Sequence, residues 1–313
     1  MELAQQIIKG DRTALGKGIT LLENTLPEYE IKAQELLRLC SPYSGKSIRV
    51  GVTGVPGVGK STFIESFGKL VTSHGKKVAV LAVDPTSQKN QGSILGDKSR
   101  MHELAANKNA FIRPSPSSGT LGGVTKKTKD SIILCEAAGY DIILIETVGV
   151  GQSETSVSNL SDFFLLLMLA GAGDELQGIK RGIMELADGL IINKADGNNI
   201  TNAKNSSQAY KRALHLFPTM ESGWIPKVSV CSAIENTGID KIWDMISSHD
   251  SQMNSNGWKN KNREKQNIYL LHQRIKEELG NKQYKLLQSE GKIKTLEKEI
   301  TKGKTIFQIL SGL

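Results

Sequence analysis

The sequence has few of the features that mark secreted, membrane-spanning or metal-clustered proteins. Its longest fully apolar run, Phe163 to Ala170, has eight residues, which is too short to cross a bilayer. The first ten residues hold no basic segment followed by an apolar run, so no signal peptide is expected. The three cysteines, Cys40, Cys135 and Cys231, are far apart, which predicts reduced thiols and neither a disulfide framework nor a zinc site. We therefore expect a cytoplasmic protein with no membrane segment.

Positive charge is concentrated near the end of the chain. The 313 residues carry a formal charge of +8, of which +6 falls in residues 250–313 and +2 in the first 249. Nucleic-acid binding is one interpretation of such a basic region, but no aromatic-interleaved basic patch or known motif supports it. A solvated helical face is the simpler interpretation, so no nucleic-acid partner is expected.

Three regions differ in their hydrophobic pattern. Residues 1–46 carry apolar residues at helical spacing up to a break at Ser41 to Gly45. Residues 47–249 alternate short apolar runs with helical stretches, which predicts one α/β domain. In residues 250–313, a polar segment at 251–257 is expected to be a linker, and charged amphipathic helix interrupted at Gly280 and Gly291 follows it. The chain should therefore have helical extensions at both ends.

The central region predicts a mainly parallel sheet flanked by helices. Several of its apolar runs lack polar alternation, as in a strand that is covered on both faces. Ligands of such sheets bind beyond the carboxyl ends of the strands, so functional residues should follow the strands directly. The strands that we expect are Ile48–Thr53, Val78–Val83, Ala110–Arg113, Asp141–Ile145, Phe163–Leu169, Gly189–Asn193 and Val228–Cys231.

A phosphate-binding loop follows the first expected strand and opens a helix. Its glycines let successive backbone amides point at one phosphate, and the helix presents its N-terminus to the same anion. Lys60 should reach the β and γ phosphates, and the Ser61 hydroxyl should bind Mg²⁺. The sequence therefore predicts the sheet of a P-loop NTPase. The pattern G-x-x-x-x-G-K-[ST] is filled by Gly54, Val55, Pro56, Gly57, Val58, Gly59, Lys60 and Ser61, and Thr62 extends the nucleotide-binding set.

An N-K-x-D motif follows the strand at residues 189–193. A carboxylate on Asp196 can accept from both the ring N–H and the exocyclic amine of guanine, a donor pair that adenine lacks. Asn193 should bind the other base edge and brace the loop, and the stem of Lys194 should lie along the purine. The motif predicts GTP or GDP as the ligand. A second base contact is expected at Ser232, Ala233 and Ile234, after the last strand.

Two strands run into acidic residues, Asp84 and Glu146. A carboxylate at a strand tip beside the phosphate loop can hold Mg²⁺ directly or through water, so both are candidate metal ligands with Ser61. Asp97 is a further candidate on spacing. The backbone amide of Gly149 can lie near the γ phosphate, so that the order of its loop depends on the bound nucleotide.

The residue after Gly149 is Val150, at a place where many small GTPases carry a glutamine that positions water. Gln152 is two residues further along. We therefore expect slow intrinsic hydrolysis that a partner accelerates.

Taken together, these motifs resemble the MeaB/ArgK family of GTPases, to which the human methylmalonic aciduria type A protein belongs. The resemblance covers roughly residues 3 to 247, whereas the C-terminal region matches only in general character. The segments that carry it are Gly10–Leu15, Ile19–Glu23, Gly51–Thr62, Val83–Ser87, Glu146–Glu154 and Ala170–Lys180.

The resemblance implies a function that spacing alone does not show. Members of the family are G-protein chaperones that gate adenosylcobalamin loading into methylmalonyl-CoA mutase, or a related acyl-CoA mutase, and protect it from inactivation. They are homodimers joined by a C-terminal helical arm, expected here at 250–313. By the same resemblance Gln177 and Lys180, in a third switch loop, join Lys60 and Glu146 as candidate catalytic or coupling residues.

Other functions remain open at this point. A metal-delivery GTPase of hydrogenase or urease maturation has a similar phosphate loop but usually carries Cys and His ligands. A small-molecule kinase with a P-loop would not need the guanine motif, and a non-enzymatic scaffold would depend mainly on the helical ends. Binding of GTP against ATP separates the kinase from the rest, and co-purification with a mutase separates the chaperone from metal delivery.

Overall fold

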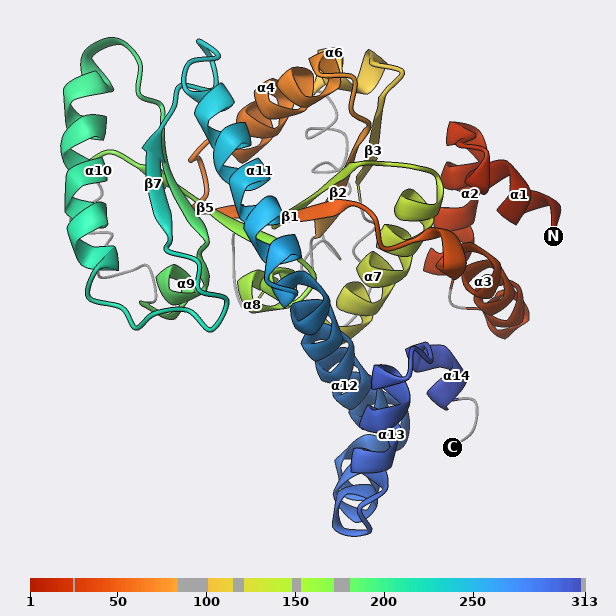
Figure 1. The fold of residues 1–313 in the computed structure, drawn as a ribbon. Coiled ribbons are helices and arrows are strands. Elements are labelled where there is room, and N and C mark those ends of the chain that lie inside the picture. Colours follow the sequence, from red (N-terminus) through yellow and green to blue (C-terminus); the bar gives the residue numbers. More distant parts are fainter. Residues whose placement is uncertain (25, 84–100, 115–120, 148–152, 172–180, 311–313) are drawn as a thin grey trace.

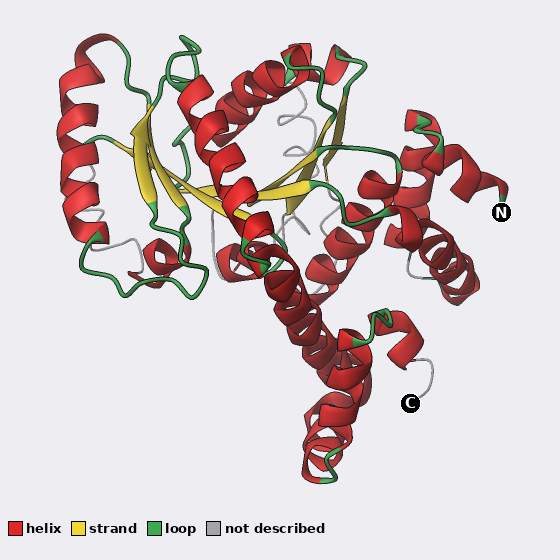
Figure 2. Cartoon of the chain, in the orientation of Figure 1, coloured by secondary structure: helices red, strands yellow, loops and turns green. Residues whose placement is uncertain are grey.

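The computed structural model describes all residues except 25, 84–100, 115–120, 148–152, 172–180 and 311–313 (Figure 1). A twisted parallel sheet forms the centre, with helices on both faces and helical extensions at both ends of the chain (Figure 2). Among the described residues, no helix combines the length and apolar character needed to span a membrane.

All of the strands that the sequence predicts are present, and every neighbouring pair is parallel. Their order across the sheet is β3-β2-β4-β1-β5-β6-β7. The fourth strand ends two residues later than expected and so includes Glu146. The strands are β1 (Ile48–Gly54), β2 (Val78–Val83), β3 (Ala110–Pro114), β4 (Ile142–Thr147), β5 (Phe163–Leu169), β6 (Gly189–Asn193) and β7 (Lys227–Val230).

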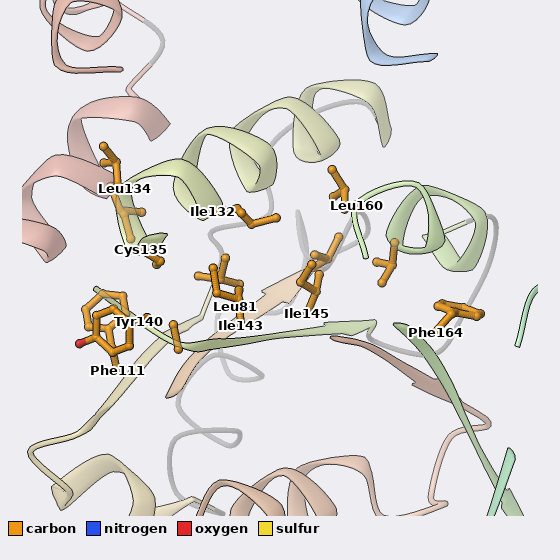
Figure 3. Close-up of a cluster of buried hydrophobic side chains, with 14 of the residues drawn as sticks. Leu81, Phe111, Ile132, Leu134, Cys135, Tyr140, Ile143, Ile145, Leu160 and Phe164 are labelled. Carbon is orange, nitrogen blue, oxygen red and sulfur yellow. The ribbon is translucent and has the colours of Figure 1, made fainter. Parts of the chain in front are cut away.

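Alternate residues of the strands enter two separate apolar cores, one on each face. One core packs against α4 (Lys60–Ser73), α6 (His102–Ala106) and α11 (Ile239–Ser255). The other packs against α7 (Leu121–Ala137), α8 (Ser153–Ser158), α9 (Arg181–Leu186) and α10 (Ile200–Leu214). In this second core, strand residues such as Leu81 and Ile143 face Ile132 and Cys135 of α7 (Figure 3). The strands are therefore covered on both faces, which explains why they lack polar alternation.

The N-terminal helices are α1 (Glu2–Ile8), α2 (Arg12–Glu23) and α3 (Pro27–Cys40), followed by the short helix η1 (Ser41–Tyr43). Asp11 caps α2 by accepting a hydrogen bond from the Ala14 amide at 2.7 Å. Gly18 allows close packing, because a Cβ there would lie 2.8 Å from Ile7 and 3.1 Å from Leu134. These helices thus extend the α7 side of the molecule.

The C-terminal extension, which we call the arm, comprises α12 (Trp258–Ser289), α13 (Lys292–Thr301) and α14 (Ile306–Leu310). It projects away from the sheet (Figure 1) and contains its own apolar cluster, which includes Leu271 and Ile275. Gly280 kinks α12, with φ 79° and ψ 161°, and Gly291 separates α12 from α13. Both interruptions were expected from the sequence.

The prediction of a linker at 251–257 is wrong. Helix α11 continues to Ser255, and only Asn256 and Gly257 separate it from α12. The reason is that Met253 lies at helical spacing from Ile246 and is buried with it, so that the exposed Ser248 and Ser251 occupy the solvent face of the same helix.

A buried cluster of four charged residues, which we call the junction cluster, joins the arm to the sheet. Arg263 of α12 donates two hydrogen bonds to Asp162, at 2.7 and 2.6 Å, and others to the carbonyl groups of Gly45 and Ser47. The cluster contains Arg49, Glu136, Asp162 and Arg263.

Within the junction cluster, Arg49 of β1 donates two hydrogen bonds to Glu136 of α7, both at 2.9 Å. Burial alone would raise the pKa of Asp162, but the hydrogen bonds and charge of Arg263 outweigh it and hold that pKa below its usual range. Burial would likewise raise the pKa of Glu136, but the charge and hydrogen bonds of Arg49 outweigh it and lower that pKa, so both carboxylates are ionised opposite two guanidinium groups.

Candidate functional site

The phosphate loop connects β1 to α4 and is shaped by three glycines with positive φ: 151° at Gly54, 77° at Gly57 and 93° at Gly59. A Cβ on Gly54 would lie 2.4 Å from the carbonyl oxygen of Leu167 on β5. Only glycine fits there, because the loop leaves β1 in close contact with the neighbouring strand. The loop ends at the first turn of α4, whose N-terminus faces the space where the motif places phosphate.

The three polar residues expected at the phosphates lie together. Lys60 Nζ donates to the Gly54 carbonyl at 2.9 Å, so its ammonium group lies over its own loop. The Ser61 hydroxyl is 3.4 Å from Glu146 Oε1. Ser61 and Glu146 are buried, with exposed fractions of 9% and 5%. A hydroxyl and a carboxylate that face each other here are hard oxygen ligands, so this pair fits Mg²⁺.

Asn193 connects the base loop to the phosphate loop. Its side chain is buried at the end of β6 and donates from Nδ2 to the Val58 carbonyl at 2.9 Å. Its Oδ1 accepts from the Ala233 amide at 3.2 Å and from Cys231 Sγ at 3.4 Å. Burial raises the pKa of Cys231 to about 12, so the thiol keeps the proton that it donates. The Asn193 side chain therefore connects the phosphate loop to the loop that follows β7.

Asp196 is held by the second base loop. Its Oδ2 accepts from the Ser232 hydroxyl at 2.6 Å, and Ser232 in turn pairs with Thr237 through the backbone. Lys194 has a positive φ of 58° and an exposed side chain. Ile234, next in the loop, is 73% exposed. The carboxylate and the loop expected to contact the base therefore lie at the same edge of the sheet.

The remaining expected residues divide into two groups. Val55, Pro56 and Thr62 belong to the phosphate loop and its helix, where the motif places them. The other group lies outside the described residues and consists of Asp84, Asp97, Gly149, Gln177 and Lys180. Across the described part of the chain, no three His, Cys, Asp or Glu side chains gather as a metal-holding group.

Two residues of the site were not found from the sequence. Cys231 donates to Asn193, and the Ser66 hydroxyl of α4 donates to the Ala233 carbonyl at 2.5 Å. Neither belongs to a motif, and the Ser66 contact spans 167 positions of the chain. No local pattern could have indicated it.

Comparisons with known proteins agree with these motifs. The family described as "Methylmalonyl Co-A mutase-associated GTPase MeaB" matches residues 15–287. A solved structure titled "Crystal structure of LAO/AO transport system kinase" has a TM-score of 0.77 and 40% identity, covering 90% of this chain and 84% of that chain.

Curated relatives give the same result. The Escherichia coli protein "GTPase ArgK" is 46% identical over 280 residues, which are 90% of this chain and 85% of the relative. The mouse protein "Methylmalonic aciduria type A homolog, mitochondrial" is 49% identical over 261 residues, which are 80% of this chain and 63% of the relative. With a phosphate loop joined to a guanine-type base loop and with these similarities, the chain belongs to the MeaB family of P-loop GTPases.

Proposed function

We propose that this chain binds GTP with Mg²⁺ and hydrolyses it slowly in the absence of a partner. The observation that carries the proposal is the bridge made by Asn193, which joins the Val58 carbonyl of the phosphate loop to the Ala233 amide of the base loop. Asp196, oriented by Ser232, can then accept from the N–H donor pair of guanine. Adenine offers no such donor pair, so it would leave that carboxylate without its hydrogen-bond partners. An unpaired carboxylate is costly in a partly buried site.

Each residue of the phosphate site has a proposed role. Lys60 would exchange the Gly54 carbonyl for the β and γ phosphates. Ser61 and Glu146 would hold Mg²⁺, which supplies positive charge to the phosphate oxygens. The same proposal places Asp84 and Asp97 near the metal, the Gly149 amide near the γ phosphate, and Gln177 and Lys180 in coupling to a partner.

We also propose that the GTPase cycle serves a client enzyme. Following the family resemblance, that client is methylmalonyl-CoA mutase or a related acyl-CoA mutase, and GTP gates the loading of its adenosylcobalamin and protects it. Nucleotide chemistry then belongs to residues 47–249, with residues 1–46 as a helical segment beside it.

Residues 250–313 are proposed as a dimerisation arm. Leu279 and Leu286 support this role, since they flank the Gly280 kink with exposed fractions of 43% and 49%. The formal charge of +6 in this region opposes the approach of a second copy, and salt screens such repulsion. Dimerisation measured by sedimentation should therefore strengthen as salt rises, and Leu286→Lys should weaken it.

The decisive experiment is GTP hydrolysis with and without purified methylmalonyl-CoA mutase. We expect slow turnover alone and stimulation by the mutase, both lost in Lys60→Ala. The matched control is Lys69→Ala on the same helix, whose half-exposed ammonium group pairs with Glu103 and should not matter.

Three outcomes would contradict parts of the proposal. Rapid turnover by the chain alone would contradict slow intrinsic hydrolysis. Absence of both stimulation and a complex would remove the mutase from the proposal and leave the GTPase intact. Equal competition by ATP and GTP would instead favour the small-molecule kinase.

A further inference from the structure

Ser66 contacts the base loop although it belongs to neither nucleotide motif. It lies in the second turn of α4, and its hydroxyl donates to the Ala233 carbonyl at 2.5 Å. Both residues are buried, at 7% and 4% exposure. The contact therefore joins the helix that follows the phosphate loop to the loop expected to contact the base.

This contact closes a ring of interactions. The Ala233 amide donates to Asn193, and Asn193 donates to the Val58 carbonyl. Val58 leads through Gly59 directly into α4, which carries Ser66. The Ala233 residue is thus held at both of its backbone polar groups, from β6 through its amide and from α4 through its carbonyl.

The neighbours of Ala233 show why this second hold matters. Ser232, immediately before it, donates to the Asp196 carboxylate at 2.6 Å. Ile234, immediately after it, is 73% exposed and adds little packing that could fix the loop. Ser232 is also paired with Thr237 through its backbone, at 3.0 and 3.1 Å. A shift of the Ala233 carbonyl would therefore act on a loop that is held at Ser232, and would change the angle at which the Ser232 hydroxyl meets Asp196, the carboxylate proposed to read guanine.

We infer that Ser66 is a positioning residue for guanine recognition. Its hydroxyl fixes the Ala233 carbonyl on α4, and Ser232 then holds Asp196 in the orientation that accepts the two donors of guanine. Without the hydroxyl, a buried carbonyl loses this donor, and the loop can recover a partner by moving towards water. The inference rests on the proposed binding of guanine nucleotides.

The test compares Ser66→Ala with the wild-type protein in binding GDP, IDP and pyrophosphate by calorimetry. IDP lacks the exocyclic amine of guanine, so the ratio of the IDP and GDP dissociation constants reports how well Asp196 accepts from it. We expect Ser66→Ala to weaken GDP about tenfold, to reduce this ratio towards one, and to leave pyrophosphate within about twofold.

Two further variants make the comparison sharper. Ser131→Ala removes a hydroxyl that is equally buried in α7 but donates to its own helix, at the Lys127 carbonyl, and should leave the ratio unchanged. Ser66→Cys is close in size and a weaker donor, so it should give an intermediate ratio even where alanine impairs folding.

The outcomes separate the inference from the function on which it rests. An unchanged ratio in folded Ser66→Ala and Ser66→Cys would overturn the positioning role, as would equal losses for GDP, IDP and pyrophosphate, which indicate a general structural effect. A wild-type protein that does not prefer GDP to IDP would contradict guanine reading by Asp196 and the inference with it.

Discussion

Arg263 lies at the root of the arm, and replacing it by alanine tests the energetic role of the junction cluster. The side chain is 12% exposed and its partner Asp162 only 5%. The substitution leaves the Asp162 carboxylate with the Arg49 amide as a donor at 2.9 Å but without its guanidinium. The carbonyl groups of Gly45 and Ser47 lose the same donor.

The expected cost is about 3–5 kcal/mol of unfolding free energy, the usual penalty for removing one partner of a buried ion pair. That loss is a large part of the roughly 5–15 kcal/mol that stabilises a typical domain. Arg263→Lys should recover little of it, because an ammonium group cannot reproduce the planar contacts to Asp162, Gly45 and Ser47.

Urea unfolding followed by circular dichroism and by tryptophan fluorescence measures this cost. Two probes are needed because the arm has its own apolar cluster and can unfold separately from the sheet. The control is Arg38→Ala, which removes an exposed pair with Glu35 and should cost no more than about 0.5 kcal/mol. A loss below about 1 kcal/mol for Arg263→Ala, or equal losses for both variants, would refute the reasoning.

The loss of unfolding free energy caused by Arg263→Ala should also become smaller as pH falls. Because the folded state holds the pKa of Asp162 below its usual value, the stabilisation is fully present above the unfolded value and is lost as pH falls through the folded one. The difference between the wild-type protein and Arg263→Ala should therefore shrink on acidification below about pH 4. A difference that grows there would contradict the assigned charge of Asp162.

Further predictions concern the sheet, its packing and the metal. His249 and Asp188 face each other at 3.8 Å between Nε2 and Oδ1, and burial lowers the pKa of His249 to about 4 and raises that of Asp188 to about 7. Between these pH values, the contribution of Asp188 to the free energy of unfolding falls as pH rises, and the contribution of His249 falls as pH falls. The two pH dependences therefore offset each other in the wild-type protein. In urea titrations, His249→Gln should therefore lose stability from pH 4 to 7 and Asp188→Asn should gain it, and parallel slopes would contradict this. Gly68→Ala would place a Cβ 2.5 Å from Leu104 and should cost about 1–3 kcal/mol, whereas Gly16→Ala, with nothing within 4 Å, should stabilise by roughly 0.5–1 kcal/mol; the reverse order of thermal midpoints would refute the packing argument. Removing Mg²⁺ with EDTA should accelerate GDP release and stop GTP hydrolysis, and unchanged rates would count against a metal held by the phosphate loop.

The strands and the nucleotide motifs could be predicted from the sequence because each depends on residues that are close along the chain. Buried parallel strands appear as continuous apolar runs, as at Val78–Val83, and the phosphate loop needs its glycines at fixed positions. The end of β4 was misplaced because Glu146 was expected to terminate the strand, whereas it continues the strand as a buried carboxylate.

Features that depend on distant partners could not be predicted. Ser251, Asn254 and Ser255 are exposed on the last turns of α11, and only the burial of Met253 reveals that this polar stretch is helical. The contact of Ser66 with Ala233 and the pairing of Arg263 with Asp162 join residues 167 and 101 positions apart. Such contacts arise from topology, which a single sequence does not display.

The two ends of β1 lie in different parts of the molecule, which can therefore be altered separately. Gly54 ends the strand at the phosphate loop, and Arg49 lies near its start in the junction cluster. Five steps of a parallel strand separate them by about 17 Å. Changes to solvent-exposed charges on the arm, beyond the junction cluster, are therefore separated from the phosphate loop by more than a screening length at physiological salt. Arms of different length or charge could be grafted after the junction cluster, so that the proposed dimerisation could be redesigned while the phosphate loop is kept.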